Sequence, residues 1–304
     1  MKRIVFMGTP DYATIILDTI IKNNFDVVAL FTQPDKPVGR KQILTPPHIK
    51  NYAIENNLQF PIYQPTKLRD IENIEIIKAL KPDFIVVAAY GQILPKEILD
   101  IAPCINLHAS LLPLYRGASP IQEALLNSDA YTGVTAMLMD IGLDSGDILG
   151  YQYIKIDDSY DVMKLFEDLS QSAANLTISV LDNFSRLQNK KQNLVDVSYC
   201  KKIKKTDGEV EFENARSLLS KYKAYKSWPE IYLPSGLKLK DIQLVDTDSS
   251  NNKGEILEVA KDYIIVGCIK GKLKIKFVQP QSKQSMNVVD YIRGKRLNIG
   301  DYLS

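Results

Sequence analysis

The chain of 304 residues is poor in the side chains that build metal centres and covalent cross-links. Its three cysteines, Cys104, Cys200 and Cys268, are scattered and form no Cys-x-x-Cys pair, which argues against a thiolate zinc site and a disulfide framework. Only two histidines are present, His48 and His108, so a histidine-rich metal motif is absent from the sequence. We therefore expect a metal-free protein from a reducing compartment.

Long apolar segments are also missing from the sequence. No run approaches the roughly 20 residues that cross a bilayer, and the apolar stretch within residues 1–10 is shorter than the core of a secretory signal. The same segment carries Met-Gly-Thr-Pro rather than a G-x-G-x-x-G loop, which disfavours a dinucleotide-dependent dehydrogenase. These absences predict a cytoplasmic protein without a membrane partner.

The net charge of +2 is small, but the charges are unevenly distributed along the chain. Residues 1–185 contain 15 Lys and Arg against 22 Asp and Glu, whereas residues 186–304 contain 23 against 14. A basic C-terminal part indicates a polyanionic partner, although a solvated, lysine-rich surface explains the same imbalance.

Strand-like and helix-like patterns alternate over the first 150 residues. Short, continuous apolar runs are typical of strands that a parallel sheet buries on both faces. The candidate strands cover residues 3–8, 27–31, 84–90, 105–109, 132–140 and 149–156, and the candidate helices cover residues 12–23, 49–57, 71–80 and 158–184. The alternation predicts an α/β fold with a doubly wound, Rossmann-like sheet, which binds ligands beyond the carboxyl ends of its strands.

Composition changes after residue 188. A polar, lysine-rich stretch follows and is predicted to be a basic linker over residues 189–205. Residues 206–304 combine a helix over 214–225 with alternating, glycine-punctuated strands, a pattern typical of a small OB-like β-barrel. We therefore predict a first domain over residues 1–188, the linker, and an OB-like domain over residues 206–304.

The run Ile-Asn-Leu-His over residues 105–108 is the first candidate site. Side chains alternate across a strand, so Asn106 and His108 point to the same face. A second polar cluster, Gly-Leu-Asp-Ser-Gly-Asp over residues 142–147, follows another strand, at the edge where such sheets bind ligands, and Asp144 within it is suited to orient a histidine. Two structural explanations stay open: a hydrogen-bonded polar pair that ends the strand, and a turn in which glycine supplies the positive φ.

Together these segments resemble the folate-dependent formyltransferases. The matching motifs are INLHASLLPLYRGASPIQEAL at 105–125, LDSGD at 143–147, MGTPDYA at 7–13, FTQPDKPVGR at 31–40, VVAAYGQILP at 86–95 and the Trp228-Pro229 pair. The histidine motif is shared by the wider family, whereas FTQPDKPVGR and the appended basic domain favour the branch that acts on initiator tRNA. The resemblance covers essentially the full chain.

The resemblance implies a reaction and a set of residues for it. The formyl group of 10-formyltetrahydrofolate would pass to the α-amino group of methionine on initiator tRNA, by direct attack of the amine on the formyl carbon. Asn106 and His108 align with family residues that donate hydrogen bonds to the developing oxyanion, and Asp144 with the one that orients the histidine and helps to move the amine proton. The residues implied in folate binding are Ser110, Leu111, Leu112, Pro113, Ala88, Tyr90, Gly91 and Ile93. No metal is implied.

Basic residues in two segments are implied in tRNA binding. Arg40 matches the family's arginine in a loop that inserts into the acceptor end of tRNA. It lies in the segment 34–50, in which prolines and a glycine predict a long non-helical excursion ahead of the helix at 49–57. The implied residues are Lys36, Arg40, Lys41, Lys201, Lys202, Lys204 and Lys205. A solvated basic loop and a solvated linker stay open as explanations.

Two other functions also stay open. A formyltransferase that acts on a nucleotide-linked amino sugar or on glycinamide ribonucleotide would use the same core motif but would leave the basic loop and the C-terminal domain unused. A non-catalytic RNA-binding protein on a disused enzyme scaffold would not be expected to keep Asn106, His108 and Asp144 together. We expect a monomer. Leu114 stands where many members of the family carry a basic residue.

Overall fold

The computed structural model describes residues 1–39 and 41–304, and the contacts between them define two compact units. The first unit consists of Met1–Pro120, Tyr131–Ile156 and Leu165–Cys200, and the second of Ile121–Ala130, Asp157–Lys164 and Lys201–Ser304. The domain bounds inferred from composition, at residues 188 and 205, stay a prediction.

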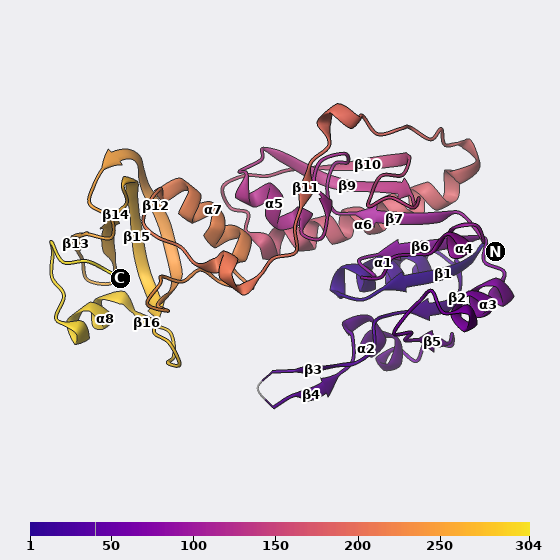
Figure 1. Cartoon of the computed structure of the whole chain (residues 1–304), viewed down its shortest axis with the longest axis horizontal. Coiled ribbons are helices and arrows are strands. Elements are labelled where there is room, and N and C mark those ends of the chain that lie inside the picture. The colour runs from indigo at the N-terminus through magenta and orange to yellow at the C-terminus, as the bar shows by residue number, and fades with distance from the viewer. Residues whose placement is uncertain (40) are drawn as a thin grey trace. The chain divides into compact units, whose positions relative to one another are not determined.

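A seven-stranded sheet forms the centre of the first unit (Figure 1). The bounds of its strands are β1 Arg3–Gly8, β2 Asp26–Phe31, β5 Ile62–Tyr63, β6 Phe84–Ala88, β7 Cys104–His108, β9 Tyr131–Leu138 and β10 Ile148–Lys155. The strand order is β10-β9-β7-β6-β1-β2-β5; the strands from β7 to β5 are parallel, while β9 runs antiparallel to both of its neighbours. The predicted α/β class is confirmed, but the sequence patterns do not show that β9 reverses direction.

Helices cover both faces of this sheet (Figure 1). On one face, α3 and α4 contribute Ile74, Ile77 and Ile98 to the core. On the other face, Tyr12 of α1 meets Phe166 of α6 edge to face, with ring centroids 6.2 Å apart. The bounds are α1 Asp11–Lys22, α2 His48–Glu55, α3 Ile71–Leu80, α4 Lys96–Leu99 and α6 Val162–Asn183, with short 3-10 turns at Phe184–Arg186 and Leu194–Asp196.

Proline marks the start of three of these helices. Pro10, Pro47 and Pro95 stand in extended backbone directly before α1, α2 and α4. Proline suits this place because its ring fixes φ and it has no N–H that would need a partner at a helix start. The first two helices therefore begin within one residue of the positions that the sequence predicts.

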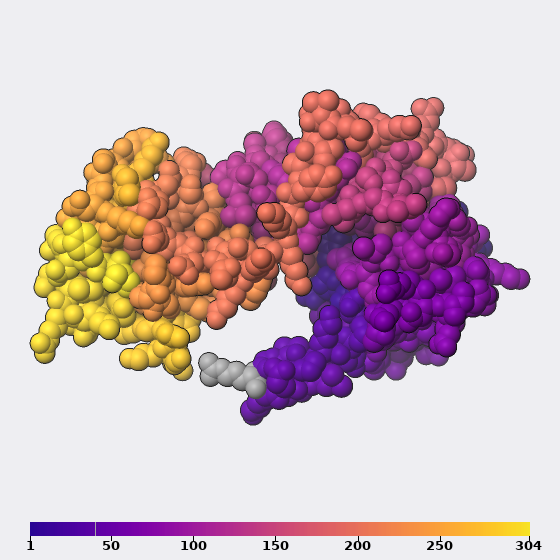
Figure 2. Space-filling model, viewed as in Figure 1, coloured from indigo at the N-terminus to yellow at the C-terminus, as the bar shows by residue number. Residues whose placement is uncertain are grey.

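The segment that carries the predicted basic excursion contains regular structure. β3 Lys36–Val38 and β4 Ile43–Thr45 pair as an antiparallel hairpin that extends from the body of the first unit (Figure 1, Figure 2). The exposed fractions of Val38, Ile43 and Leu44 are 55%, 61% and 64%. The hairpin therefore presents apolar as well as basic side chains to solvent.

Residues 190–200, which we call the return segment, pack back onto the first unit although they lie within the predicted linker. Lys190 pairs with Ile148 in an isolated antiparallel bridge. Further along, β11 Tyr199–Cys200 pairs in parallel with β8 Arg116–Gly117, which lies within the histidine motif at 105–125. The return segment is therefore part of the surroundings of the candidate site.

The second unit is rich in antiparallel strands, as its alternating sequence predicts. The sheet order is β12-β15-β14-β13, and β16 pairs with β15. The bounds are β12 Lys238–Ser250, β13 Ile256–Val259, β14 Ile264–Gly267, β15 Lys270–Gln279 and β16 Met286–Asn287, with α7 Ala215–Tyr225, α8 Val288–Lys295 and a 3-10 turn at Lys205–Gly208; α5 Pro120–Leu126 lies almost wholly in this unit. Among the described residues, no helix is long and apolar enough to cross a membrane.

Candidate active site

Asn106 and His108 lie on β7, an inner strand between β6 and β9. They share a face with Cys104, which belongs to the core that α3 and α4 cover. Only 9% of Asn106 and 7% of His108 is exposed. Polar groups buried to this degree need hydrogen-bond partners, because an unsatisfied buried donor or acceptor is costly.

Asp144 reaches this polar pair by a path that the sequence does not predict. Because β9 is antiparallel to β7, its last residue lies opposite Ile105, and the N–H of Met139 donates to the carbonyl of Cys104 at 2.8 Å. The loop over residues 139–147 therefore starts beside the amino end of β7 and folds back toward the polar pair. The expectation that this loop leaves a strand at the carboxyl edge is wrong, because β9 runs in the opposite direction.

The three side chains nevertheless meet. Oδ1 of Asp144 accepts a hydrogen bond from Nδ2 of Asn106 at 3.4 Å, and Oδ2 lies 3.7 Å from Nδ1 of His108. The backbone N–H of Gly117 donates to Oδ2 at 2.9 Å. The side chain of Asp144 is only 14% exposed, so water weakens its electrostatic contacts less than it would at the surface.

Both ring nitrogens of His108 have a defined environment. Nε2 lies 2.9 Å from the carbonyl oxygen of Tyr115. A carbonyl can only accept, so Nε2 carries a hydrogen and donates it. Nδ1 faces the carboxylate of Asp144, and it can donate there only when the ring is protonated on both nitrogens.

The backbone of the Asp144 loop is unusual at a non-glycine residue. Asp144 has φ +48°, in the left-handed region that few L-residues adopt. The expectation that glycine supplies the positive φ in this turn is therefore wrong. Glycine is needed instead for close approach at position 146, because a Cβ on Gly146 would lie 1.7 Å from the backbone carbonyl oxygen of Leu138.

The loop that follows β7, which is implied in folate binding, is held in place by hydrogen bonds to its backbone. Ser110 is fully buried, and its Oγ donates to the carbonyl of Leu114 at 2.6 Å. The backbone carbonyl of Ser110 accepts a hydrogen bond from Oγ1 of Thr135 at 2.6 Å. The backbone of Leu112 is held by Thr135 through its N–H and by the Tyr151 hydroxyl through its carbonyl. The side chains of Ser110 and Leu112 are therefore part of the interior.

The second group implied in folate binding is divided between core and surface. Ala88 and Tyr90 are buried, whereas Ile93 is 86% exposed. Burial raises the pKa of the Tyr90 hydroxyl, which has no hydrogen-bond partner within the described parts of the chain. The members of both groups that stay at least partly accessible are Leu111, Pro113, Gly91 and Ile93.

The basic residues implied in tRNA binding fall on both units. Lys36 is exposed on β3 and Lys41 is exposed beside the hairpin, while Arg40 lies outside the described residues. The other four are exposed at the start of the second unit: Lys201, Lys202, Lys204 and Lys205.

Gln192 is a residue of this site that sequence reasoning missed. It is 8% exposed, and its Nε2 donates to the carbonyls of Asp144 at 2.9 Å and Gly146 at 2.8 Å. Its Oε1 accepts from Nη2 of Arg116 at 2.7 Å. A glutamine in a polar, lysine-rich stretch has no local feature that distinguishes it from a solvated one, so only a motif around it would have indicated this position.

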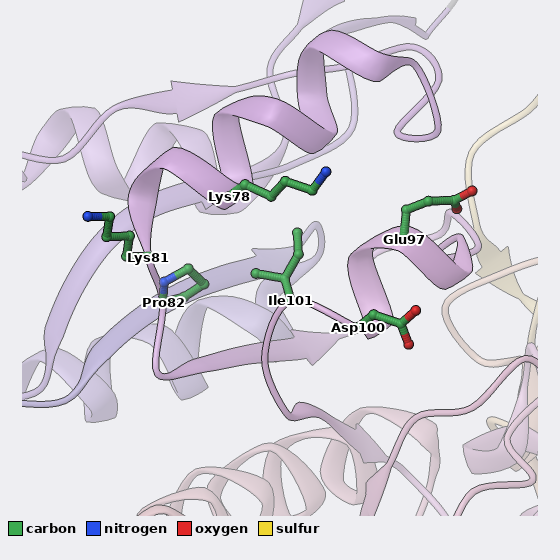
Figure 3. A pocket seen from close by; sticks show the side chains of 6 residues that line it. All are labelled: Lys78, Lys81, Pro82, Glu97, Asp100 and Ile101. Atoms are coloured by element: carbon green, nitrogen blue, oxygen red, sulfur yellow. The ribbon is translucent and has the colours of Figure 1, made fainter.

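In the part of the chain that the structure describes, the candidate site includes neither a cluster of metal ligands nor the pocket that Figure 3 shows. Within the described residues, no group of His, Cys, Asp and Glu side chains is arranged to hold a metal ion. The pocket in Figure 3 lies between the end of α3 and α4, before β6 and β7 begin, and its lining residues are Lys78, Lys81, Pro82, Glu97, Asp100 and Ile101. It therefore shares no residue with the polar cluster.

Comparison with known families agrees with the site. The profile described as "Formyl transferase" matches residues 1–181, and the profile described as "Formyl transferase, C-terminal domain" matches residues 202–296. The chain therefore belongs to the formyl transferase family, and it is an enzyme of the transferase class. The resemblance inferred from the motifs is confirmed.

Close relatives share a particular name within this family. A methionyl-tRNA formyltransferase of Nitratiruptor sp. is 58% identical over 299 residues, which cover 98% of this chain and 99% of the relative. A methionyl-tRNA formyltransferase of Sulfurimonas denitrificans is 56% identical over 303 residues, which cover 99% and 100%. The similarity includes both units.

A solved structure supports the fold. The N-formyltransferase from Helicobacter canadensis, in complex with folinic acid and dTDP-3-aminofucose, superimposes with a TM-score of 0.69 at 20% identity. The match covers 91% of this chain and 99% of that one.

Proposed function

We propose that this enzyme transfers the formyl group of 10-formyltetrahydrofolate to the α-amino group of methionine on initiator tRNA, for translation initiation. One observation carries the proposal: the buried cluster of Asn106, His108 and Asp144 lies in a chain that is similar over nearly its full length to proteins named methionyl-tRNA formyltransferase. A free α-amine has a pKa of about 8, so a usable neutral fraction exists near pH 7 and the enzyme's main tasks are positioning and charge stabilisation.

Asn106 supplies the first hydrogen-bond donor for the reacting carbonyl. One hydrogen of its Nδ2 is directed at Asp144 through a long 3.4 Å contact, which leaves the other for the formyl oxygen. Negative charge develops on that oxygen as the amine adds to the formyl carbon. A preorganised donor in a buried site stabilises such charge more effectively than water does.

His108 and Asp144 complete the site and handle the proton. Because Nε2 of His108 is bonded to the Tyr115 carbonyl, Nδ1 is the nitrogen that faces the reacting groups. It serves as the second oxyanion donor in the cationic form of the ring, in which both nitrogens carry a hydrogen. Asp144 lies beside it and receives the proton that the amine loses as the new C–N bond forms. It then returns the proton to the folate nitrogen as the bond between that nitrogen and the formyl carbon breaks.

We assign the folate to the two implied loops of the first unit, and the tRNA to the exposed basic residues of the chain. The accessible residues of the two implied loops suit a flat pterin ring, because they combine the half-buried side chains of Leu111 and Pro113 with the exposed Gly91 and Ile93. The exposed lysines of the hairpin and of the start of the second unit, together with Arg40, would contact tRNA phosphates. Cys104, Cys200 and Cys268 are all buried and none forms a disulfide, which is consistent with a cytoplasmic enzyme, and we propose that it is a monomer.

A formylation assay tests the substrate. Purified enzyme with 10-formyltetrahydrofolate should formylate initiator methionyl-tRNA much faster than elongator methionyl-tRNA. Rapid turnover of a nucleotide-linked amino sugar or of glycinamide ribonucleotide, with none of the tRNA, would contradict the proposal.

A pair of histidine variants tests the site. His108→Ala should lower turnover about 100-fold or more with little change in tRNA affinity, because an oxyanion donor acts mainly in the transition state. His48→Ala is the matched control, since His48 is exposed at the start of α2. Near-normal turnover of the His108 variant would remove the oxyanion role.

A further inference from the structure

One buried glutamine joins the return segment to the loop that carries Asp144. The two hydrogens of the Gln192 amide go to the carbonyls of Asp144 and Gly146, at 2.9 Å and 2.8 Å. Its oxygen accepts from both Nε and Nη2 of Arg116, at 3.1 Å and 2.7 Å. A guanidinium can only donate and a carbonyl can only accept, so a single orientation of the amide satisfies all four contacts.

The loop has a particular need for this support at Asp144. A non-glycine residue at φ +48° is unfavourable by itself and persists only where its surroundings hold it. The carbonyls that Gln192 binds belong to this residue and to Gly146, two positions further on. The side chain thus fixes the backbone on which the carboxylate is mounted.

Arg116 fixes the other end of the glutamine. It is only 5% exposed, and the described parts of the chain place no carboxylate within ion-pair distance of its guanidinium. Its backbone N–H donates to the carbonyl of Ser198 at 2.9 Å, and it pairs with Tyr199 of β11. The return segment therefore holds Arg116 through its backbone and, by way of Gln192, through its side chain.

We propose that Gln192 is a positioning residue for the reaction, and that through it the return segment sets the place of the Asp144 carboxylate against Asn106 and His108. The inference rests on the proposed function, which assigns the proton to Asp144. Gln192 contacts the backbone of Asp144 and not its carboxylate, so it acts on the chemistry only through that residue.

Substitutions that separate the two ends of the side chain test this role. Gln192→Glu keeps an oxygen for Arg116 and should fold, but it can no longer donate to the two carbonyls. Gln192→Ala removes both ends. We expect each to lower kcat about 10- to 100-fold, because a small misplacement of a reacting group has an effect of this order, with KM for both substrates within about two-fold of the wild type. Gln188→Ala is the control, because Gln188 is an exposed glutamine just before the return segment.

A second measurement does not depend on the substrate. The chain has only two histidines, so the NMR signals of their rings are readily assigned. In Gln192→Glu the ring signals of His108 should move, because Asp144 faces its Nδ1, while those of His48 stay in place. This comparison remains informative even if the wild-type enzyme does not formylate methionyl-tRNA, a result that would refute the proposed function alone.

Three outcomes overturn the positioning role. One is a wild-type kcat in Gln192→Glu, and another is unmoved ring signals of His108 in that variant. The third is a general loss of structure, in which the signals of both histidines move and KM rises as kcat falls.

Discussion

At the scale of single residues, close backbone approach governs the loop that presents Asp144. Gly146 is buried, and the carbonyl of Leu138 occupies the place that a Cβ would need. That carbonyl cannot easily withdraw, since Leu138 ends β9 and its N–H is bonded to the carbonyl of Asp147 at 2.8 Å. The glycine is therefore required by packing, whatever its φ.

Alanine in place of Gly146 should both destabilise the enzyme and slow it. Overpacking of this kind typically lowers the free energy of unfolding by about 1–3 kcal/mol, and the displaced loop would carry Asp144 away from His108. Urea unfolding and the formylation rate measure the two effects. Gly294→Ala is the control: Gly294 lies in α8 with open space around it, and its replacement should raise stability by about 0.5–1 kcal/mol. Equal effects of the two substitutions would contradict this reading of the loop.

At the scale of elements, the β3–β4 hairpin combines an exposed outer part with an anchored base. Nζ of Lys50 lies 2.9 Å from both carboxylate oxygens of Asp35 and 2.7 Å from Oε1 of Gln64. Hydrogen bonds from Gln64 and from Lys50 lower the pKa of Asp35 below its ordinary value. The anchor fixes the start of the hairpin relative to α2, which carries Lys50.

Removing the hairpin lysines should weaken tRNA binding and its dependence on salt. In Lys36→Ala/Lys41→Ala, each lost phosphate contact lowers the slope of log affinity against log salt by roughly 0.7–0.9. Binding curves at several salt concentrations measure this change, and turnover at saturating tRNA should be preserved. Lys96→Ala on α4 is the control, because Lys96 is also exposed but lies on another element, beside Asp100. An unchanged slope would contradict the proposed phosphate contacts and would support the alternative that Lys36 and Lys41 are only solvated surface residues.

A partly buried ion cluster makes the second unit sensitive to acid. Burial by itself raises the pKa of Glu230, but hydrogen bonds from Lys238 and Lys240 outweigh it and hold the pKa below the ordinary 4.5. A carboxyl whose pKa is depressed in the folded state stabilises it above the pKa of the unfolded chain. That contribution is lost as the pH falls below about 4.5 through the folded value.

The pH dependence of unfolding tests this cluster. Wild-type protein should lose stability in acid more steeply than Glu230→Gln, and the difference between them should narrow as Glu230 becomes protonated. Trp228 is the only tryptophan in the chain, so its fluorescence reports the unfolding of this unit selectively. Parallel pH profiles of the two proteins would show that the cluster contributes nothing to the acid response.

At the scale of the whole molecule, the boundary between the first unit and the C-terminal part of the second, after Cys200, has a physical basis. Composition places the end of the first domain at residue 188, but Gln192 and β11 continue to pack against the first unit as far as Cys200. Most side chains of residues 188–205 are exposed, which explains the lysine-rich composition, but Gln192 and Cys200 are buried. Composition alone does not reveal these two buried positions.

Two truncated chains should therefore differ in stability. A chain that ends after Cys200 keeps the bridge from Lys190, the Gln192 contacts and the β8–β11 pairing, whereas a chain that ends after Gln188 loses all three. We expect a higher thermal midpoint for the longer chain. Equal midpoints would support the boundary at residue 188.

Much of the fold and part of the site could be predicted from local patterns. Apolar runs and prolines placed β1, β2, β6 and β7 and the helices α1, α2 and α3, because burial on both faces of a sheet and helix starts leave marks within a few residues. The short helix α4 was not predicted. The spacing of two between Asn106 and His108 likewise fixes their common face. Strand direction leaves no such mark, which is why the reversal of β9 was not foreseen.

By itself the sequence determined the α/β class, the antiparallel second unit, the pairing of Asn106 with His108 on one face, and the family. These depend on periodicity and on motifs, which are properties of neighbouring residues. Only the tertiary structure decided how Asp144 reaches the pair, which ring nitrogen of His108 is committed to the backbone, and what Gln192 binds. Asp144 is 38 residues from Asn106, and Gln192 is 48 residues from Asp144. Contacts across such separations form only when the strands have taken their order and direction, and no local pattern carries that information.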